Sequence, residues 1–143
     1  MTLADPRIQR FLGTKDVVVL ATLQRDGAPL AMPMWFVPDA ESLVMISVAD
    51  TQKVRNLRRD PRVSVVAESV SASGAICGVT VLGRVEFLAD GPERRALIAR
   101  LLTKYDPRLE RLWGGREMPP NRVMFRVVPS RVRDWGLPDS EAR

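Results

Sequence analysis

Short apolar segments recur along this chain, and turn residues separate them. The first, residues 17–23, is a continuous apolar run typical of a strand that is covered on both faces. Asp26-Gly27 tolerates positive φ and predicts a hairpin, so residues 29–37 should return as the second strand. Pro33 has no amide hydrogen for a ladder, so an edge, a bulge or a split should lie near it. Further strands are expected at residues 43–48, 63–67, 75–88 and 123–127.

Helical patterns are fewer than strand patterns. A short helix is expected at residues 6–14, and the capping-box spacing of Asp90 and Glu93 predicts another. The second helix carries an apolar stripe from Leu97 to Tyr105, which indicates packing on a core rather than contact with a cofactor.

The remaining features are bends within a strand and the connections between elements. Gly78 and Gly83 mark bends or close backbone approaches inside the long strand 75–88. Irregular structure is expected at residues 69–74, at residues 106–121 and, as a basic tail, at residues 131–143. Strands outnumber helices and turns are frequent, so residues 1–143 should form a single, mainly β domain, a β-barrel with peripheral helices.

The chain contains no histidine and only one cysteine. This composition excludes Ser-His-Asp and Cys-His catalysis, zinc held by histidine and haem ligated by histidine. No metal site is therefore expected. If the protein is an enzyme, a bound cofactor should carry the difficult chemistry.

The formal net charge is +5 and the isoelectric point is about 10.3. A basic balance favours polyanions or small molecules that carry phosphate or carboxylate groups. Arg55, Arg58 and Arg59 share one helix face, which is either a solvated surface or a ligand contact. Aromatic residues make up only 6% of the chain, which argues against a nucleic-acid-binding barrel that stacks bases.

Compartment signals point to the cytoplasm. No apolar run approaches the length of a membrane span, and the first twenty residues lack the layout of a signal peptide. The single Cys77 cannot form an internal disulfide, which fits a reducing compartment, and it should be a buried small apolar residue rather than a reactive thiol.

The stretch from Ile46 to Ser64 predicts an anion site. A strand should end near Val48, Asp50 can cap a following helix, and Asp60-Pro61 should stop that helix. Free amides at a helix start favour anions, and Lys53 stands in the first turn, where its ammonium can meet a phosphate.

The same stretch carries a family resemblance. Residues 51–63 resemble the signature of the pyridoxamine-phosphate-oxidase-like split-barrel flavoproteins, and are most similar to their actinobacterial flavin- or deazaflavin-dependent branch. Residues 19–29 resemble the first hairpin, residues 32–36 its return strand, and residues 123–135 the closing strand and tail. The ordered set spans residues 8 to 137 and implies an FMN-binding split barrel, a six-stranded antiparallel Greek-key barrel.

The resemblance also implies a cofactor site. The residues that it places there are Pro33, Met34, Trp35, Ser47, Val48, Lys53, Asn56 and Trp135. Lys53 would contact the cofactor phosphate, and Asn56 would either bind the same anion or cap a neighbouring loop. Trp35 would border the ring, or serve as a core or interface residue. Trp135 would reach a partner subunit, since the family forms homodimers whose sites take residues from both chains. Trp113 would line a substrate mouth or anchor its loop.

The leading functional hypothesis is an oxidoreductase that uses a non-covalently bound deazaflavin (F420), or alternatively FMN, to transfer hydride to an unsaturated small-molecule substrate. The longer Arg- and Lys-bearing strand motif of true pyridoxamine-phosphate oxidases is not visible before Val19, which argues against vitamin B6 oxidation. The alternatives are a protein that binds or stores the cofactor without turnover and, less favoured, a basic nucleic-acid-binding barrel.

Overall fold

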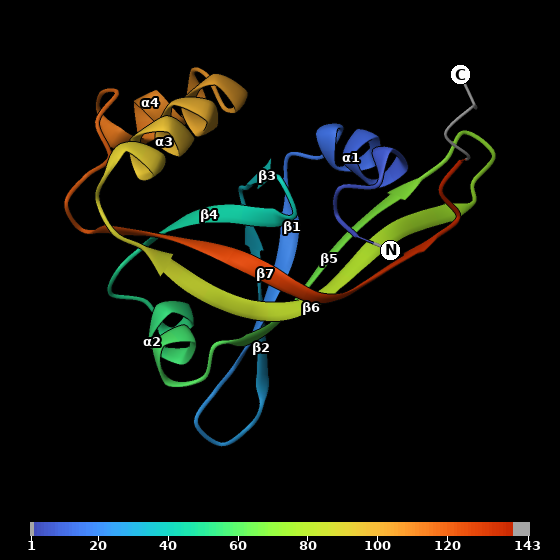
Figure 1. Cartoon of the computed structure of the whole chain (residues 1–143), viewed down its shortest axis with the longest axis horizontal. Helices are drawn as coiled ribbons and strands as arrows, with labels where there is room; N and C mark the ends of the chain where they lie inside the picture. The colour runs from blue at the N-terminus through green and yellow to red at the C-terminus, as the bar shows by residue number, and fades with distance from the viewer. Residues whose placement is uncertain (1, 139–143) are drawn as a thin grey trace.

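The computed structural model describes residues 2–138, and within that range seven antiparallel strands form one sheet (Figure 1). The strands are β1 (Val18–Leu23), β2 (Pro29–Met34), β3 (Val37–Asp39), β4 (Ser42–Val48), β5 (Arg62–Val70), β6 (Ile76–Leu88) and β7 (Arg122–Trp135). Their order is β2-β1-β5-β6-β7-β4-β3. The helices are α1 (Pro6–Gly13), α2 (Gln52–Arg59), α3 (Pro92–Lys104) and α4 (Arg108–Trp113). The prediction of a mainly β barrel with peripheral helices is confirmed.

The sheet has one strand more than the six predicted, because the expected second strand divides. Residues 29–37 form β2 and β3, which separate at Trp35 and Phe36 and lie at the two edges of the sheet. Pro33 pairs opposite Val19 in the edge strand β2, where a missing amide donor does not interrupt a ladder on the outer side. The expected edge and the expected split near this proline are both confirmed.

The long strands β6 and β7 curve across the whole molecule (Figure 1). Their register shifts between Leu82 and Gly83, which lie opposite Arg131 and Pro129, so Ser130 is the extra residue of a bulge. The prediction of a short last strand followed by a basic tail from Arg131 was wrong. Pairing with β6 resumes after the bulge and continues to Trp135, and residues 139–143 of the expected tail lie outside the described part of the chain.

Two apolar clusters hold the fold together. The first fills the barrel, where Phe36, Met45 and Phe125 are fully buried and α1 adds Ile8 and Leu12. The second lies between the outer side of β4 and the α3–α4 pair. Its members include Val44, Leu101, Leu109 and Met124. Residues 108–113 were expected to be irregular, but form α4, which is too short to show a helical period and is fixed by burial of Leu109.

The helix starts differ from the predicted caps. Thr51 caps α2, since its Oγ1 accepts from the Val54 amide at 3.4 Å, whereas the expected cap Asp50 pairs with Arg55 at 2.8 Å. The capping box expected at α3 is not formed, because Gly91 occupies the cap position without a side-chain bond. Both helices begin within a few residues of the predicted positions.

The exposure of side chains corrects the prediction that residues 17–23 are covered on both faces, and it confirms the predicted burial of Cys77. Within one chain residues 17–23 are fully covered on one face only, because Val17 and Val19 remain 40% and 37% exposed. Strand β5 runs to Val70, into the segment expected to be a loop. Cys77 is buried, as predicted. Among the helices of residues 2–138, none is sufficiently long and apolar to cross a bilayer.

Candidate functional site

A cavity of about 370 Å³ opens where β4 ends. This volume falls within the range of ligand pockets, roughly 300–1,000 Å³. In Figure 1 the end of β4 and the start of β7 pass between α2 on one side and the α3–α4 pair on the other. Six of the eight predicted site residues line the cavity: Pro33, Met34, Trp35, Ser47, Val48 and Lys53. The other lining residues are Ile46, Leu101, Tyr105, Leu109, Leu112, Trp113 and Arg122.

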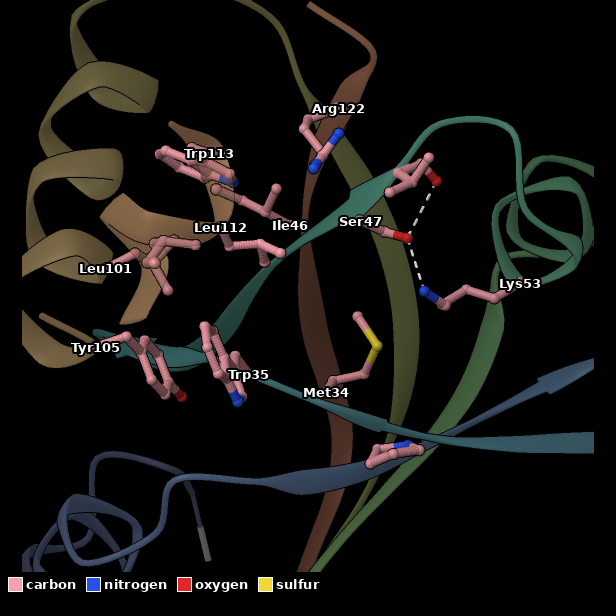
Figure 2. Close-up of a pocket in the computed structure, with 13 residues that line it drawn as sticks. Met34, Trp35, Ile46, Ser47, Lys53, Leu101, Tyr105, Leu112, Trp113 and Arg122 are labelled. Atoms are coloured by element: carbon pink, nitrogen blue, oxygen red, sulfur yellow. Dashed lines mark hydrogen bonds between the residues drawn. The ribbon is translucent and has the colours of Figure 1, made fainter. Parts of the chain in front are cut away.

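Lys53 supplies the first positive charge of the cavity. Helix α2 begins four residues after β4, which brings the Lys53 side chain back to the strand, and its Nζ donates to Ser47 Oγ at 2.7 Å (Figure 2). Ser47 Oγ donates in turn to the Val48 carbonyl at 3.2 Å. Burial lowers the pKa of Lys53 from its ordinary value. No carboxylate among residues 2–138 pairs with this ammonium, which therefore keeps donors for an anion.

Two stacked rings form a flat wall of the cavity. Trp35 and Tyr105 lie with their ring centroids 4.4 Å apart and their planes 6° from parallel. Two hydrogen bonds to the backbone fix Tyr105, because its hydroxyl accepts from the Phe36 amide at 2.8 Å and donates to the Asp16 carbonyl at 2.7 Å. Burial raises the pKa of Tyr105 to about 12. The wall is therefore anchored to the strand backbone and suits a planar apolar ligand.

Arg122 is a cavity residue that sequence reasoning missed. It is the first residue of β7 and lies opposite Val48 in the β4–β7 register. Its Nη1 donates to Asn121 Oδ1 at 2.5 Å, and within the described chain no ion pair joins it to a carboxylate. Nothing local distinguishes this arginine from the other basic residues, since only the pairing of β7 with β4 brings it to the cavity.

Asn56 does not line the cavity. It is fully buried, its Nδ2 donates to Thr22 Oγ1 at 3.0 Å, and its Oδ1 accepts from Gln52 Nε2 at 2.9 Å. The bond to Thr22 joins α2 to β1, and the bond to Gln52 lies within α2. The amide that was predicted either to bind an anion or to cap a neighbouring segment is thus engaged within the protein.

Trp135 also lies away from the cavity, at the opposite end of the 14-residue strand β7 from Arg122. Its ring covers Gly78, where an added Cβ would come within 2.5 Å of the indole and of the Ala67 carbonyl. The indole is 38% exposed. A contact of Trp135 with a cofactor would require a second chain.

The basic face of α2 has protein partners. Arg55 pairs with Asp50, the Arg58 guanidinium lies 4.2 Å from the centroid of the Phe87 ring, and Arg59 donates to the Leu23 carbonyl. None of these three arginines lines the cavity. The positive charge of the cavity is therefore supplied by Lys53 and Arg122 rather than by this face.

The family follows from comparison with known sequences. Residues 4–136 match the family model described as pyridoxamine 5'-phosphate oxidase. The chain belongs to this family. The match includes every residue that lines the cavity.

Solved structures agree with the family. The conserved hypothetical protein Rv2991 from Mycobacterium tuberculosis is 26% identical, with 97% of this chain and 91% of that chain covered and a TM-score of 0.77. HutZ, the heme storage protein from Vibrio cholerae, is 20% identical, with coverages of 94% and 96% and a TM-score of 0.76. A FAD-binding protein from Mesorhizobium loti is 23% identical, with coverages of 94% and 95% and a TM-score of 0.74. At these identities the last two show a shared fold.

Proposed function

We propose that this protein is an oxidoreductase that binds a flavin-type cofactor non-covalently in the cavity at the end of β4. The observation that carries the proposal is Lys53, a half-buried ammonium that has no carboxylate partner within residues 2–138 and lies at a helix start beside the flat Trp35–Tyr105 wall. A phosphate needs such a cation, and a tricyclic ring needs such a wall. Membership of the family and similarity to a FAD-binding protein support this cofactor class.

The residues of the chain fit such a group. Lys53 and the Ser47 hydroxyl would hold the phosphate, and Met34, Trp35 and the backbone at Val48 would border the ring. The bound cofactor would supply hydride transfer to or from an unsaturated organic substrate. The protein would position both molecules and exclude water, and the Ser47 hydroxyl and the Lys53 ammonium would serve to bind the phosphate.

Between the two flavin-type candidates we favour the deazaflavin F420 over FMN. The support is the resemblance of residues 51–63 to the actinobacterial flavin- or deazaflavin-dependent branch, together with the formal net charge of +5, which suits an acidic polyglutamate tail. Fluorescence titration with both cofactors, followed by a reduction assay with the tighter binder, tests the choice.

Replacing Lys53 by methionine should weaken binding of the cofactor by about 1–3 kcal/mol, the scale of a lost charge-assisted hydrogen bond. The dissociation constant, measured by fluorescence quenching, should rise roughly 5- to 150-fold. Arg55→Met is the matched control, because Arg55 lies on the same helix, carries the same charge and pairs with Asp50 outside the cavity. An equal loss of affinity in both variants would show that Lys53 acts only through general electrostatic attraction. An unchanged dissociation constant in Lys53→Met would show that Lys53 does not bind the cofactor.

We further propose that the active form is a homodimer with shared cofactor sites. One face of the sheet exposes apolar side chains among polar ones: Val19 lies opposite Pro33 on β2 and Val66 on β5, so these three side chains share that face. Leu82 is 43% exposed and Trp135 is 38% exposed. Light scattering should therefore give twice the mass of the chain, whereas a monomer that still binds the cofactor would contradict shared sites.

A second candidate function is binding or storage of the cofactor without turnover. Similarity to the heme storage protein HutZ favours this class of activity, although the present chain has no histidine to ligate a haem iron. Tight uptake of FMN or F420 without hydride transfer to any tested acceptor would select storage over catalysis. Oligonucleotide binding with a steep salt dependence and no cofactor uptake would instead support the nucleic-acid alternative.

A further inference from the structure

The cavity has two chemically different halves, because successive side chains of a strand point to opposite faces. Met45 belongs to the barrel core and Ile46 packs against the α3–α4 cluster. Ser47 therefore points to the same side as Met45, where it meets Lys53, and Val48 points to the same side as Ile46. Figure 2 shows Lys53 and Ser47 together, with Ile46, Leu112 and Trp113 on the other side of Ser47.

The half that faces α4 is apolar and carries its own cation. Leu112, at 65% exposure, is a large apolar side chain with little protein cover, and the neighbouring Trp113 lines the same cavity. Arg122 shares the face of Val48, its cross-strand partner, and Figure 2 shows its guanidinium directed into the space between Trp113 and Ser47. Its one described hydrogen-bond acceptor is the neutral amide of Asn121.

Such a half suits one class of ligand. An unpaired guanidinium binds a carboxylate through two parallel hydrogen bonds, and an indole beside exposed leucine favours a planar apolar body. The Lys53 half has a different donor, a point-charge ammonium backed by a hydroxyl. Two separate cations in one cavity point to two anionic groups that are recognised independently.

We propose that the half formed by Arg122, Leu112 and Trp113 is a subsite for a planar aromatic carboxylate, which is the substrate class of this protein. As a substrate assignment the inference rests on the proposed function; as a binding site it stands on these residues alone. Arg122 would bind the carboxylate, and the α4 side chains would cover the aromatic ring. The Lys53 half and the Trp35–Tyr105 wall would stay available for the cofactor.

The test uses cinnamate as the probe and cinnamamide as its neutral counterpart, with binding followed by tryptophan fluorescence in the full chain. Wild type should prefer cinnamate by about tenfold or more, the effect of one charge-assisted contact. Arg122→Met should abolish that preference, and Leu112→Ser should weaken both probes. Arg111→Met is the matched control, because Arg111 lies on α4, is exposed and does not line the cavity. Circular dichroism of each variant checks the fold.

Each outcome bears on the subsite. Loss of the preference in Arg122→Met but not in Arg111→Met supports it, as does cinnamate binding that persists when FMN or F420 is present. An unchanged preference in Arg122→Met, or displacement of cinnamate by cofactor alone, overturns it. If neither cofactor binds while cinnamate still binds through Arg122, the proposed function fails and the subsite stands. If a cofactor binds through Lys53 and cinnamate does not bind, the subsite fails and the proposed function stands.

Discussion

A Gly83→Ala variant should be destabilised by about 3 kcal/mol or more, the upper range for forcing extra atoms into packed structure. Gly83 lies at the β6–β7 bulge, opposite Pro129 and next to the register shift. An added Cβ would overlap the Val128 carbonyl oxygen and approach Pro129 Cα at 3.1 Å. Both neighbours are backbone atoms of the paired strand, so relief requires the two longest strands of the sheet to separate.

Urea denaturation followed by circular dichroism measures this loss. Gly13→Ala is the control, because Gly13 ends α1 with no atom within 4 Å of an added Cβ, and this change should raise stability by at most about 1 kcal/mol, opposite in sign to the loss expected at Gly83. Gly83→Ala with wild-type stability would show that the bulge can relax, and that close approach is not the reason for glycine at this position.

A Tyr105→Ala variant should lose about 3–5 kcal/mol of stability, the usual cost of deleting a large buried aromatic side chain. Tyr105 is fully buried, stacks on Trp35, and its hydroxyl satisfies the amide of Phe36, which is itself fully buried. Tyr105→Phe keeps the ring and leaves that amide without its acceptor, so it should lose about 1–3 kcal/mol. The order wild type, Phe, Ala in thermal and urea unfolding separates the hydroxyl from the ring. Equal stability of wild type and Tyr105→Phe would show that the hydroxyl bonds contribute nothing net.

The same hydroxyl predicts a pH dependence. Burial raises the pKa of Tyr105 in the folded state to about 12, above the ordinary pKa of 10.0 for a tyrosine phenol. Its contribution is therefore fully present below pH 10 and is lost as the pH rises from 10 to 12. The stability difference between wild type and Tyr105→Phe should shrink across that window. Tyr105 is the only tyrosine, so the ultraviolet absorbance of tyrosinate reports its titration directly. A midpoint near 10 would contradict the buried, bonded hydroxyl.

The local features of the fold were predictable because they depend on neighbours in the chain. Apolar segments separated by turn residues predicted the strands, and Pro33 indicated the edge strand and the split beside it. The contact between Lys53 and Ser47 joins residues six positions apart across one strand-to-helix turn. Two residues so close in the chain belong to one local motif, so the half of the cavity formed by Lys53 and Ser47 could be predicted from the sequence.

Several features were decided by pairing and packing over long distances. Arg122 reaches the cavity through the register of β7 with β4, and the Trp35–Tyr105 stack joins residues that are far apart in the chain. The six-residue helix α4 is too short for a detectable period, and its position depends on burial of Leu109 against α3 and β4.

Asn56 and Trp135 are predicted site residues that the tertiary structure places outside the cavity. Asn56 stands on the correct helix near Lys53, but the packing of α2 on β1 turns its amide toward Thr22. Trp135 stands in the correct strand, but the length of β7 carries it away from the cavity of its own chain. The sequence by itself determined the strand pattern, the helix start beside β4 and the excess of positive charge. Only the tertiary structure decided which distant side chains share the cavity, because strand register and helix packing are set by burial of the whole core.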